Sequence, residues 1–147
     1  MPARSPLQIR EADLLRPVSR FARRKGFRFQ YAELPFFDYR IDLYGFSRPT
    51  GDTVAIELKL KDWRRAFDQA LIYQLCSDYV YIAIPLSTAL RVERGHLLAH
   101  GIGMIAVDPS MRCSILLDAL RSSEVRDYYR QPYVELLERQ PNERYKA

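Results

Sequence analysis

Two carboxylates and an amine, Asp42, Glu57 and Lys59, are spaced so that they could act on one substrate. They fall in residues 38–46 and 53–60, where apolar and polar side chains alternate as in half-buried β-strands. Two carboxylates held close together repel each other unless a positive charge lies between them. Divalent cations such as Mg²⁺ prefer oxygen ligands and keep waters that phosphate oxygens can replace. The three residues therefore predict a site for cation-assisted chemistry on a phosphate ester.

The turn between the two strands decides whether these groups meet. Residues 47–52, "SRPTGD", are rich in turn-forming residues. A turn centred between Pro49 and Thr50 places Asp42 opposite Glu57, with Lys59 diagonal to Asp42. Opposed residues in an antiparallel pair have Cβ atoms about 4.5–5.5 Å apart. The same register gives the apolar residues of both strands a common face, in two pairs: Ile41 with Leu58, and Leu43 with Ile56.

A second interpretation of this hairpin stays open from the sequence. Amphipathic strands often carry Glu and Lys on a solvated face, where Asp42–Lys59 and Arg40–Glu57 contacts would be ordinary ion pairs. A slip of two residues would also keep the alternation of faces while separating the two acids.

Three further features lie near the proposed site. Glu11 falls on the apolar stripe of a predicted first helix, where a carboxylate without a partner is costly; a glutamate at the helix edge that reaches water is the alternative. Gln69 and Tyr73 form an i, i+4 pair on one face of a later helix, which is otherwise a polar helix edge. A basic cluster lies at the start of that helix, close in sequence to the proposed site; the alternative is a solvated helix start. The cluster consists of Lys61, Arg64 and Arg65.

The patterns along the chain predict one α/β domain spanning residues 1–147, with a core of about 5–108 and a C-terminal extension of about 112–140. The first helix begins near Ser5, ends before Gly26, and has a kink or a junction of two helices at Pro17. The other expected helices are 63–77, 86–101 and 122–139, the last disturbed near Pro132. The expected strands are 27–34, 38–46, 53–60, 78–85, 103–109 and 112–119. This order predicts a mixed sheet with helices on both faces.

Composition limits the classes of function. The chain has 147 residues, 48% of them apolar, and a formal charge of +5, which suits a folded domain with an anionic partner. It has no apolar run near the length of about 18 residues that a membrane helix requires. The start "MPARSP" does not resemble a signal peptide, so we expect a cytoplasmic protein with no membrane partner. Cys76 and Cys113 are then expected to be reduced core thiols.

The combination of motif and element order resembles the PD-(D/E)xK nuclease superfamily, whose fold is restriction-endonuclease-like. The matching residues are Asp42 and, after fourteen others, Glu57-Leu58-Lys59, on a hairpin preceded by a helix that carries Glu11. The expected α-β-β-β-α-β order over Ser5–Pro85, a little over half of the chain, is the core of that family. "QALIY" (69–73) resembles the Q-x-x-x-Y motif of its exonuclease-like branch. The acid in the first helix is similar to archaeal Holliday-junction resolvases, and the family's variable proline is Ile41 here.

The resemblance implies a role for each matching residue. Asp42, Glu57 and the carbonyl of Leu58 would bind Mg²⁺ or Mn²⁺, with Glu11 as a third acid acting directly or through water. Lys59 would orient or deprotonate the attacking water and stabilise charge on the phosphate. Two further side chains would position the metal ligands or the nucleic-acid backbone: Gln69 and Tyr73.

The resemblance also implies a function. The implied activity is phosphodiester hydrolysis of DNA, in preference to RNA, in repair, recombination or mobile-element processing. The alternative is an inactive module of the same fold that binds nucleic acid or a protein. A homodimer is compatible with either function.

Other candidate residues have simpler explanations. His96 and His100 have a spacing that can bind zinc, but no third ligand is evident. Glu33 is an alternative third acid, and Asp108 is predicted to be a turn residue. A basic set in and after the first helix could follow a phosphate backbone or form a solvated face: Arg16, Arg20, Arg23, Arg24, Lys25 and Arg28. Three tyrosines could stack on bases, form a dimer contact or pack in the core: Tyr128, Tyr129 and Tyr133.

Overall fold

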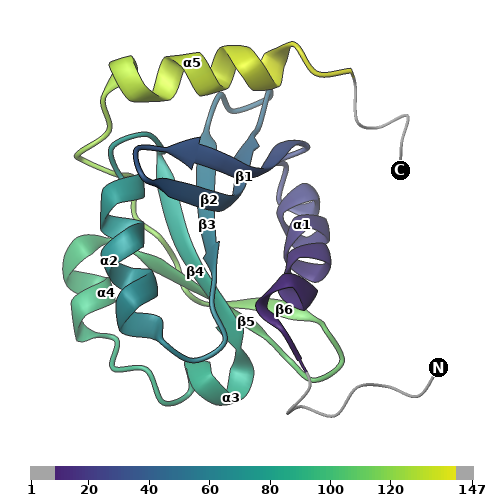
Figure 1. Ribbon diagram of the computed structural model, residues 1–147, viewed down its shortest axis with the longest axis vertical. Helices are drawn as coiled ribbons and strands as arrows, with labels where there is room; N and C mark the ends of the chain where they lie inside the picture. The colour runs from purple at the N-terminus through teal and green to yellow at the C-terminus, as the bar shows by residue number, and fades with distance from the viewer. Residues whose placement is uncertain (1–8, 142–147) are drawn as a thin grey trace.

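Six strands form one mixed sheet in the computed structural model of the protein, which describes residues 9–141 (Figure 1). The strands lie in chain order across the sheet. The β3–β4 and β4–β5 pairs are parallel, and the other neighbours are antiparallel. The strands are β1 (Phe29–Phe36), β2 (Tyr39–Phe46), β3 (Thr53–Leu58), β4 (Tyr79–Pro85), β5 (Gly103–Val107) and β6 (Cys113–Leu117).

Helices cover both faces of this sheet, as predicted. The helical elements are η2 (Glu11–Leu14), α1 (Leu15–Arg24), α2 (Trp63–Tyr73), α3 (Leu86–Ala89), α4 (Gly95–His100) and α5 (Asp127–Glu138). One core joins α1 to Leu43, Val54 and Ile56. A second core, on the other face, holds the apolar residues of the remaining α-helices. Among residues 9–141, no helix combines the length and apolar character needed to cross a membrane.

The first helix differs from its prediction. Its expected start at Ser5 lies outside the described residues, and the chain at Glu11–Leu14 is a 3₁₀ turn that abuts α1. This is the predicted junction of two helices, placed before Pro17. Because α1 starts at Leu15, Pro17 lies in its first turn, where a backbone N–H has no partner within the helix.

Several other element bounds also differ. The first strand starts at Phe29, two residues later than predicted, and the expected helix 86–101 is divided into α3 and α4. The last helix starts at Asp127, and it continues through Pro132 to Glu138. The predicted cap of α2 is confirmed, since the Asp62 carboxylate accepts a 3.2 Å hydrogen bond from the backbone of Arg65.

The register of the β2–β3 hairpin is the predicted one. Leu43 pairs with Ile56, and Phe46 pairs with Thr53 at the other end of the ladder. All six residues of β3 are buried, so this strand is covered on both faces. The solvated-face interpretation is therefore wrong for Glu57, whose exposed fraction is 4%.

The predicted common face of Ile41 and Leu43 is not observed. Ile41 lies in the core that contains Tyr44, and Leu43 lies in the core beneath α1. The β1–β2 ladder pairs Ala32 with Leu43 and Leu34 with Ile41 but skips the residues between them, Glu33 and Asp42, and Glu33 has a φ of 55°. A residue in this left-handed conformation interrupts strand alternation, and β2 follows β1 because the two strands are paired. The predicted Ile41–Leu58 pair is consequently absent from the ladder.

Candidate active site

The carboxyl groups of Asp42 and Glu57 lie close together at the end of the β2–β3 ladder, and each changes the pKa of the other. Burial and, after it, the negative charge of Asp42 together raise the pKa of Glu57 to about 8, while the Tyr73 hydroxyl opposes this shift. Burial also raises the pKa of Asp42, against a lowering contribution from the backbone of Leu58. The pair therefore keeps a proton near neutral pH when no cation is bound.

Neighbouring groups hold both carboxyls in place. The backbone N–H of Leu58 donates a 2.8 Å hydrogen bond to Asp42 Oδ2. The hydroxyl of Tyr73 lies 3.1 Å from Glu57 Oε1 and 3.2 Å from the carbonyl oxygen of Arg40. Tyr73 is fully buried in α2, so it links that helix to β2 and β3 at the acid pair. Such fixed partners preorganise the carboxyls for binding.

Lys59 lies beside this pair, and its charge lowers the pKa of both Asp42 and Glu57. Its side chain is 17% exposed, and its Nζ is 3.9 Å from Glu11 Oε1. The backbone N–H of Lys59 donates to the carbonyl oxygen of Ala83, which fixes the end of β3 against β4. Neither alternative ion pair, Asp42–Lys59 or Arg40–Glu57, forms among residues 9–141.

Glu11 lies at the rim of the site, not on a buried stripe. The prediction of a buried Glu11 is wrong because the 3₁₀ turn changes the direction of its side chain, which is 47% exposed. Its carboxylate accepts a 3.4 Å hydrogen bond from the backbone of Leu60. The charge of Glu11 contributes to the raised pKa of Asp42, so the three acids act on one another electrostatically.

Gln69, which was predicted to act beside Tyr73, lies in α2. Its Oε1 is buried and has no hydrogen-bond partner among the described residues. An unpaired buried amide oxygen is costly, and such atoms mark sites that bind an ion, a water or a ligand. Gln69 lies one helical turn before Tyr73, as the i, i+4 spacing predicts.

The donors in this site fit a divalent cation. Glu57 is buried and Asp42 is half-buried, and their neighbouring carboxyl oxygens suit a hard cation that prefers oxygen. Within the described part of the chain, no group of three or more His, Cys, Asp and Glu residues is close enough to hold a metal. The cation would therefore be held by these two carboxylates and the predicted Leu58 carbonyl, with Glu11 acting from the rim.

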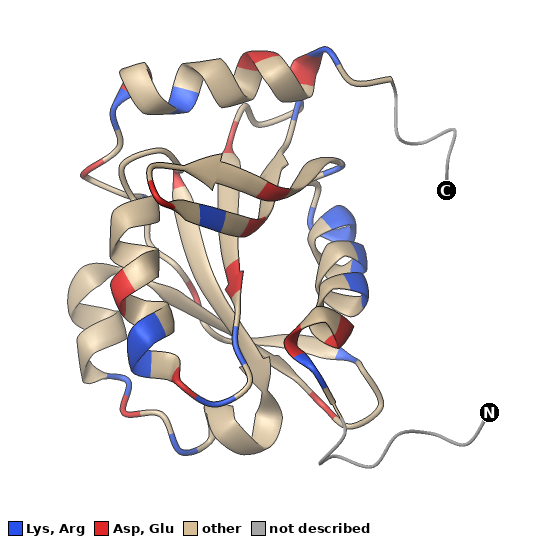
Figure 2. Cartoon of the chain, in the orientation of Figure 1, with Lys and Arg blue, Asp and Glu red and all other residues tan. Residues whose placement is uncertain are grey.

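Two basic segments lie on the surface, one along the outer side of α1 and one at the start of α2 (Figure 2). The start of α2 carries the exposed residues Lys61, Arg64 and Arg65. The outer face of α1 and the turn after it have no acid between Leu14 and Arg28. The exposed cations of this segment are Arg16, Arg20, Arg23, Arg24, Lys25 and Arg28.

Other predicted candidates lie outside this cluster. The rings of His96 and His100 pack around Phe67, and both residues are exposed. Glu33 is exposed on β1. Asp108 is a turn residue, as predicted, and it forms an ion pair with Arg112. Of the two cysteines, Cys76 is buried and Cys113 is half-buried.

Main-chain groups of the site carry no sequence signal. The carbonyl of Arg40 and the N–H of Leu60 are such groups, since any residue supplies them. The exposed ring of Phe37 was also not predicted. The sequence does contain a signal for this ring: Phe37 and Asp38 form a two-residue hairpin loop that contains no glycine, which is unusual for such a loop.

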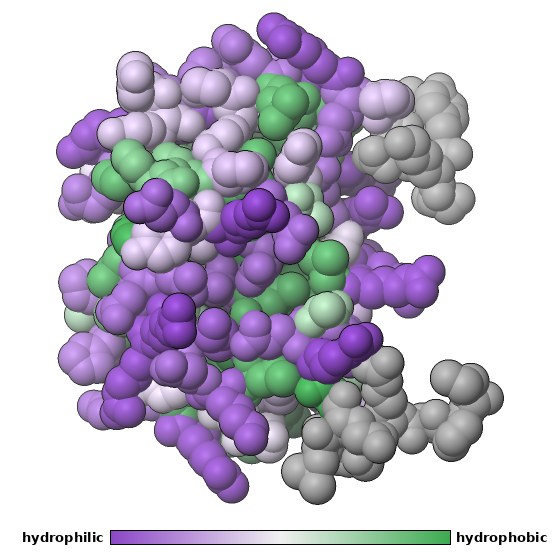
Figure 3. Space-filling model, in the orientation of Figure 1, coloured by the Kyte–Doolittle hydropathy of each residue, from purple (hydrophilic) through white to green (hydrophobic). Residues whose placement is uncertain are grey.

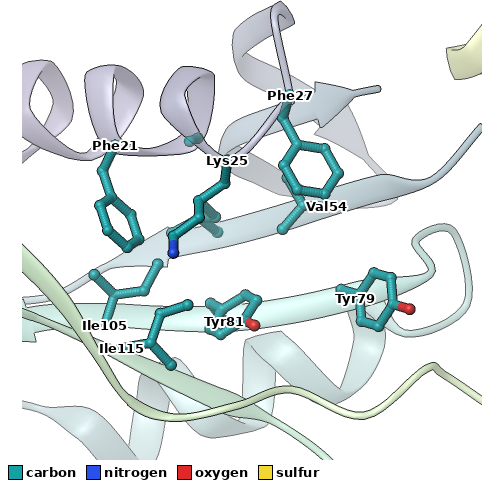
Figure 4. A pocket seen from close by; sticks show the side chains of 10 residues that line it. Phe21, Lys25, Phe27, Val54, Tyr79, Tyr81, Ile105 and Ile115 are labelled. Atoms are coloured by element: carbon teal, nitrogen blue, oxygen red, sulfur yellow. The ribbon is translucent and has the colours of Figure 1, made fainter. Parts of the chain in front are cut away.

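An apolar pocket of about 230 Å³ lies on the other face of the sheet, beneath α1 (Figure 4). Ten residues line it, including Phe21, Tyr79, Tyr81 and Ile115, and none of the ten is an acid. Lys25 is its one charged lining residue and points into it. This pocket lacks groups for hydrolysis, so the candidate chemistry belongs to the acid pair on the α2 face.

The comparisons with known proteins support the fold and do not bear on the function. No protein-family model matches the chain, and no curated protein matches its sequence. A solved structure of a protein of unknown function from Silicibacter pomeroyi superposes with a TM-score of 0.68 at 19% sequence identity. The match covers 89% of this chain and 86% of that chain. The chain thus has an α/β fold with a six-stranded mixed sheet, flanking helices and a C-terminal helix.

Proposed function

We propose that this protein is a divalent-cation-dependent nuclease of the PD-(D/E)xK type that hydrolyses phosphodiester bonds in DNA. The observation that carries the proposal is the close pair of a buried Glu57 and a half-buried Asp42, with Lys59 beside them. Buried carboxyls of like charge destabilise each other unless they bind a proton or a cation. Cation binding by Asp42 and Glu57 would explain why the protein has two carboxyls whose mutual repulsion lowers its stability.

Each group then has a distinct chemical task. A divalent cation held by the pair would neutralise charge on the phosphate and lower the pKa of an attacking water. Lys59 supplies a positive charge to the same phosphate or takes the proton of that water. Tyr73 keeps Glu57 oriented through its 3.1 Å hydrogen bond. Gln69 offers its unpaired oxygen to the water or to a ligand in the site.

The choice of DNA as substrate rests on charge. The six exposed cations of α1 and the following turn have no acid among them, and the η2 turn that carries Glu11 directly precedes α1. Such a surface suits a phosphate backbone, whose contacts dominate nonspecific affinity and weaken with salt. Repair, recombination and mobile-element processing are the proposed settings for this activity.

Cleavage assays with Mg²⁺ and Mn²⁺ test this proposal. Labelled single-stranded, duplex and branched DNA should be cut in the presence of the metal and remain intact in chelator. Asp42→Ala and Glu57→Ala should abolish cutting while circular dichroism shows a folded protein. A purified wild-type protein that cuts none of these DNAs, and no RNA, contradicts the proposal.

An inactive nucleic-acid-binding module is the second candidate function. The cationic face of α1 favours it independently of the acid pair. This function predicts salt-sensitive DNA binding whose affinity is unchanged by chelation, together with no cleavage under any metal.

A further inference from the structure

The tip of the β1–β2 hairpin holds a phenylalanine in an unfavourable backbone conformation. Phe36 pairs with Tyr39, so Phe37 and Asp38 form the two-residue loop. Phe37 has a φ of 53°, in the left-handed region, whereas Asp38 does not have a positive φ. Glycine adopts this conformation without steric cost and is favoured at the first position of such a loop. A bulky residue retained there points to a use for its side chain.

The ring of Phe37 is presented to solvent together with a second ring. The exposed fractions are 63% for Phe37 and 83% for Tyr128 in α5. Tyr129 lies between them, with ring centroids 5.4 Å from Phe37 and 5.2 Å from Tyr128. Figure 3 shows apolar surface over the hairpin tip. A hollow of about 390 Å³, here called the aromatic pocket, is lined by Phe36, Phe37, Tyr128, Tyr129, Pro132 and Tyr133.

The aromatic pocket is preformed. The hydroxyl of Tyr133 donates a 2.5 Å hydrogen bond to the carbonyl oxygen of Pro35, which ties α5 to the hairpin. The ring of Tyr133 also packs edge-on against Tyr44, which is fully buried. The inner wall, formed by Phe36 and Tyr133, is fixed by core contacts, so a ligand entering the pocket need not order these two rings.

The pocket and the acid pair share one strand. Phe37, the exposed Arg40 and Asp42 follow one another along the hairpin. Phe37 and Asp42 are five positions apart in the sequence, which is at most about 17 Å at the strand rise of about 3.4 Å per residue. A second link runs through Tyr39, whose ring lies edge-on to Tyr73, the partner of Glu57. A nucleic-acid strand with one phosphate at the acid pair would have neighbouring bases within reach of the pocket.

We propose that the aromatic pocket stacks an unpaired base of the nucleic acid strand that is held at the acid pair. This inference rests on the proposed function and narrows its substrate to strands with unpaired bases, such as single-stranded ends, overhangs and loops. Aromatic side chains bind any base through its π-face, and a base in a duplex is already stacked. Arg40, between the rings and the acids, would meet the intervening phosphate.

A protein partner fits the pocket less well. A stable protein interface buries about 800 Å² on each partner, with large apolar side chains at its centre. Among the pocket residues that the structure describes, the strongly exposed rings are Phe37 and Tyr128 alone.

Fluorescence anisotropy in chelator, where no cleavage occurs, tests the inference. The probes are a labelled oligothymidylate and a blunt duplex of the same length. Wild-type protein should bind the oligothymidylate more tightly, and Phe37→Gly and Tyr128→Ala should each weaken that binding by about 5- to 150-fold. Leu90→Ala, which truncates another exposed apolar side chain, should bind like wild type. Phe37→Gly should melt at the same temperature as wild type or higher, because it removes backbone strain.

Three results overturn the inference: Phe37→Gly binding like wild type, equal affinity for the blunt duplex, or a dimer that Phe37→Gly converts to monomer in sedimentation. The last result would assign the pocket to contacts between copies of the chain. The proposed nuclease activity fails separately. If the protein cuts no DNA with Mn²⁺ but Phe37→Gly weakens oligothymidylate binding, the nuclease proposal fails and the base pocket stands. If the protein cuts DNA and Phe37→Gly has no effect on binding, the base pocket fails and the nuclease proposal stands.

Discussion

The backbone N–H of Leu58 donates a 2.8 Å hydrogen bond to the Asp42 carboxylate where the β2–β3 ladder ends. A side chain of β2 thus takes the place of the next backbone partner. This substitution directs the Asp42 carboxyl across the hairpin to Glu57, and it makes the position of one acid depend on the backbone of the strand that carries the other.

Asp42→Asn should separate the structural role of Asp42 from its chemical role. The amide oxygen of Asn can still accept from Leu58, so the free energy of unfolding should change by less than about 1 kcal/mol. Asp42→Ala leaves that N–H without a partner and should cost about 1–3 kcal/mol. Both variants should lose cleavage, as measured with labelled DNA and Mn²⁺. An Asp42→Asn protein that cuts like wild type would contradict the role of the carboxylate in the site.

Glu57 should make the metal-free protein less stable as pH rises. The folded protein holds the Glu57 proton up to a pKa of about 8, whereas the unfolded chain releases it near its ordinary value of 4.5. Between these values the folded state binds more protons, so unfolding free energy falls with pH by at most about 1.4 kcal/mol per unit. Glu57→Gln removes this slope. Urea denaturation in chelator, from about pH 5 to pH 8, measures the difference; parallel curves for the two proteins would be inconsistent with a shared proton.

Gln69→Leu should lower the cleavage activity without a large loss of stability. The variant removes a buried oxygen that lacks a partner, so the unfolding free energy should stay within about 1 kcal/mol of wild type or rise. Cleavage should fall by about 10- to 100-fold, as for other groups that orient metal ligands. The two readouts are urea denaturation and initial cleavage rates with Mn²⁺. Full activity in Gln69→Leu would show that the unpaired oxygen has no part in the site.

Asp78 provides a stability control at the opposite end of β3. Its buried carboxylate accepts hydrogen bonds from Thr53 and pairs with Arg130 at 2.9 Å, which joins β3 to α5. Asp78→Ala leaves Arg130 and the Thr53 N–H without this partner and should cost about 3–5 kcal/mol. Below its melting temperature this variant should still bind Mn²⁺ like wild type, which thermal denaturation with and without the metal can show.

The sequence predicts the acid pair well because strand alternation and turn length together determine a register. The contact of Tyr73 with Glu57 agrees with the predicted face of that helix, on which i and i+4 residues lie together, and the part of Gln69 in the site stays a prediction. The position of Glu11 was not predictable from helix periodicity, because the chain there forms a 3₁₀ turn with a different period. Ile41 was misplaced because Glu33, an ordinary strand residue by type, adopts a positive φ that changes the faces of both strands.

The most direct test of the central claim is isothermal titration of Mn²⁺ into wild-type protein and Asp42→Asn. The account predicts saturable heat for wild type with about one ion per chain, proton release that increases as the buffer pH falls below the pKa of Glu57, and no heat for Asp42→Asn. Absence of heat with wild-type protein, or equal heat with Asp42→Asn, would mean that the facing carboxyls of Asp42 and Glu57 do not form a cation site.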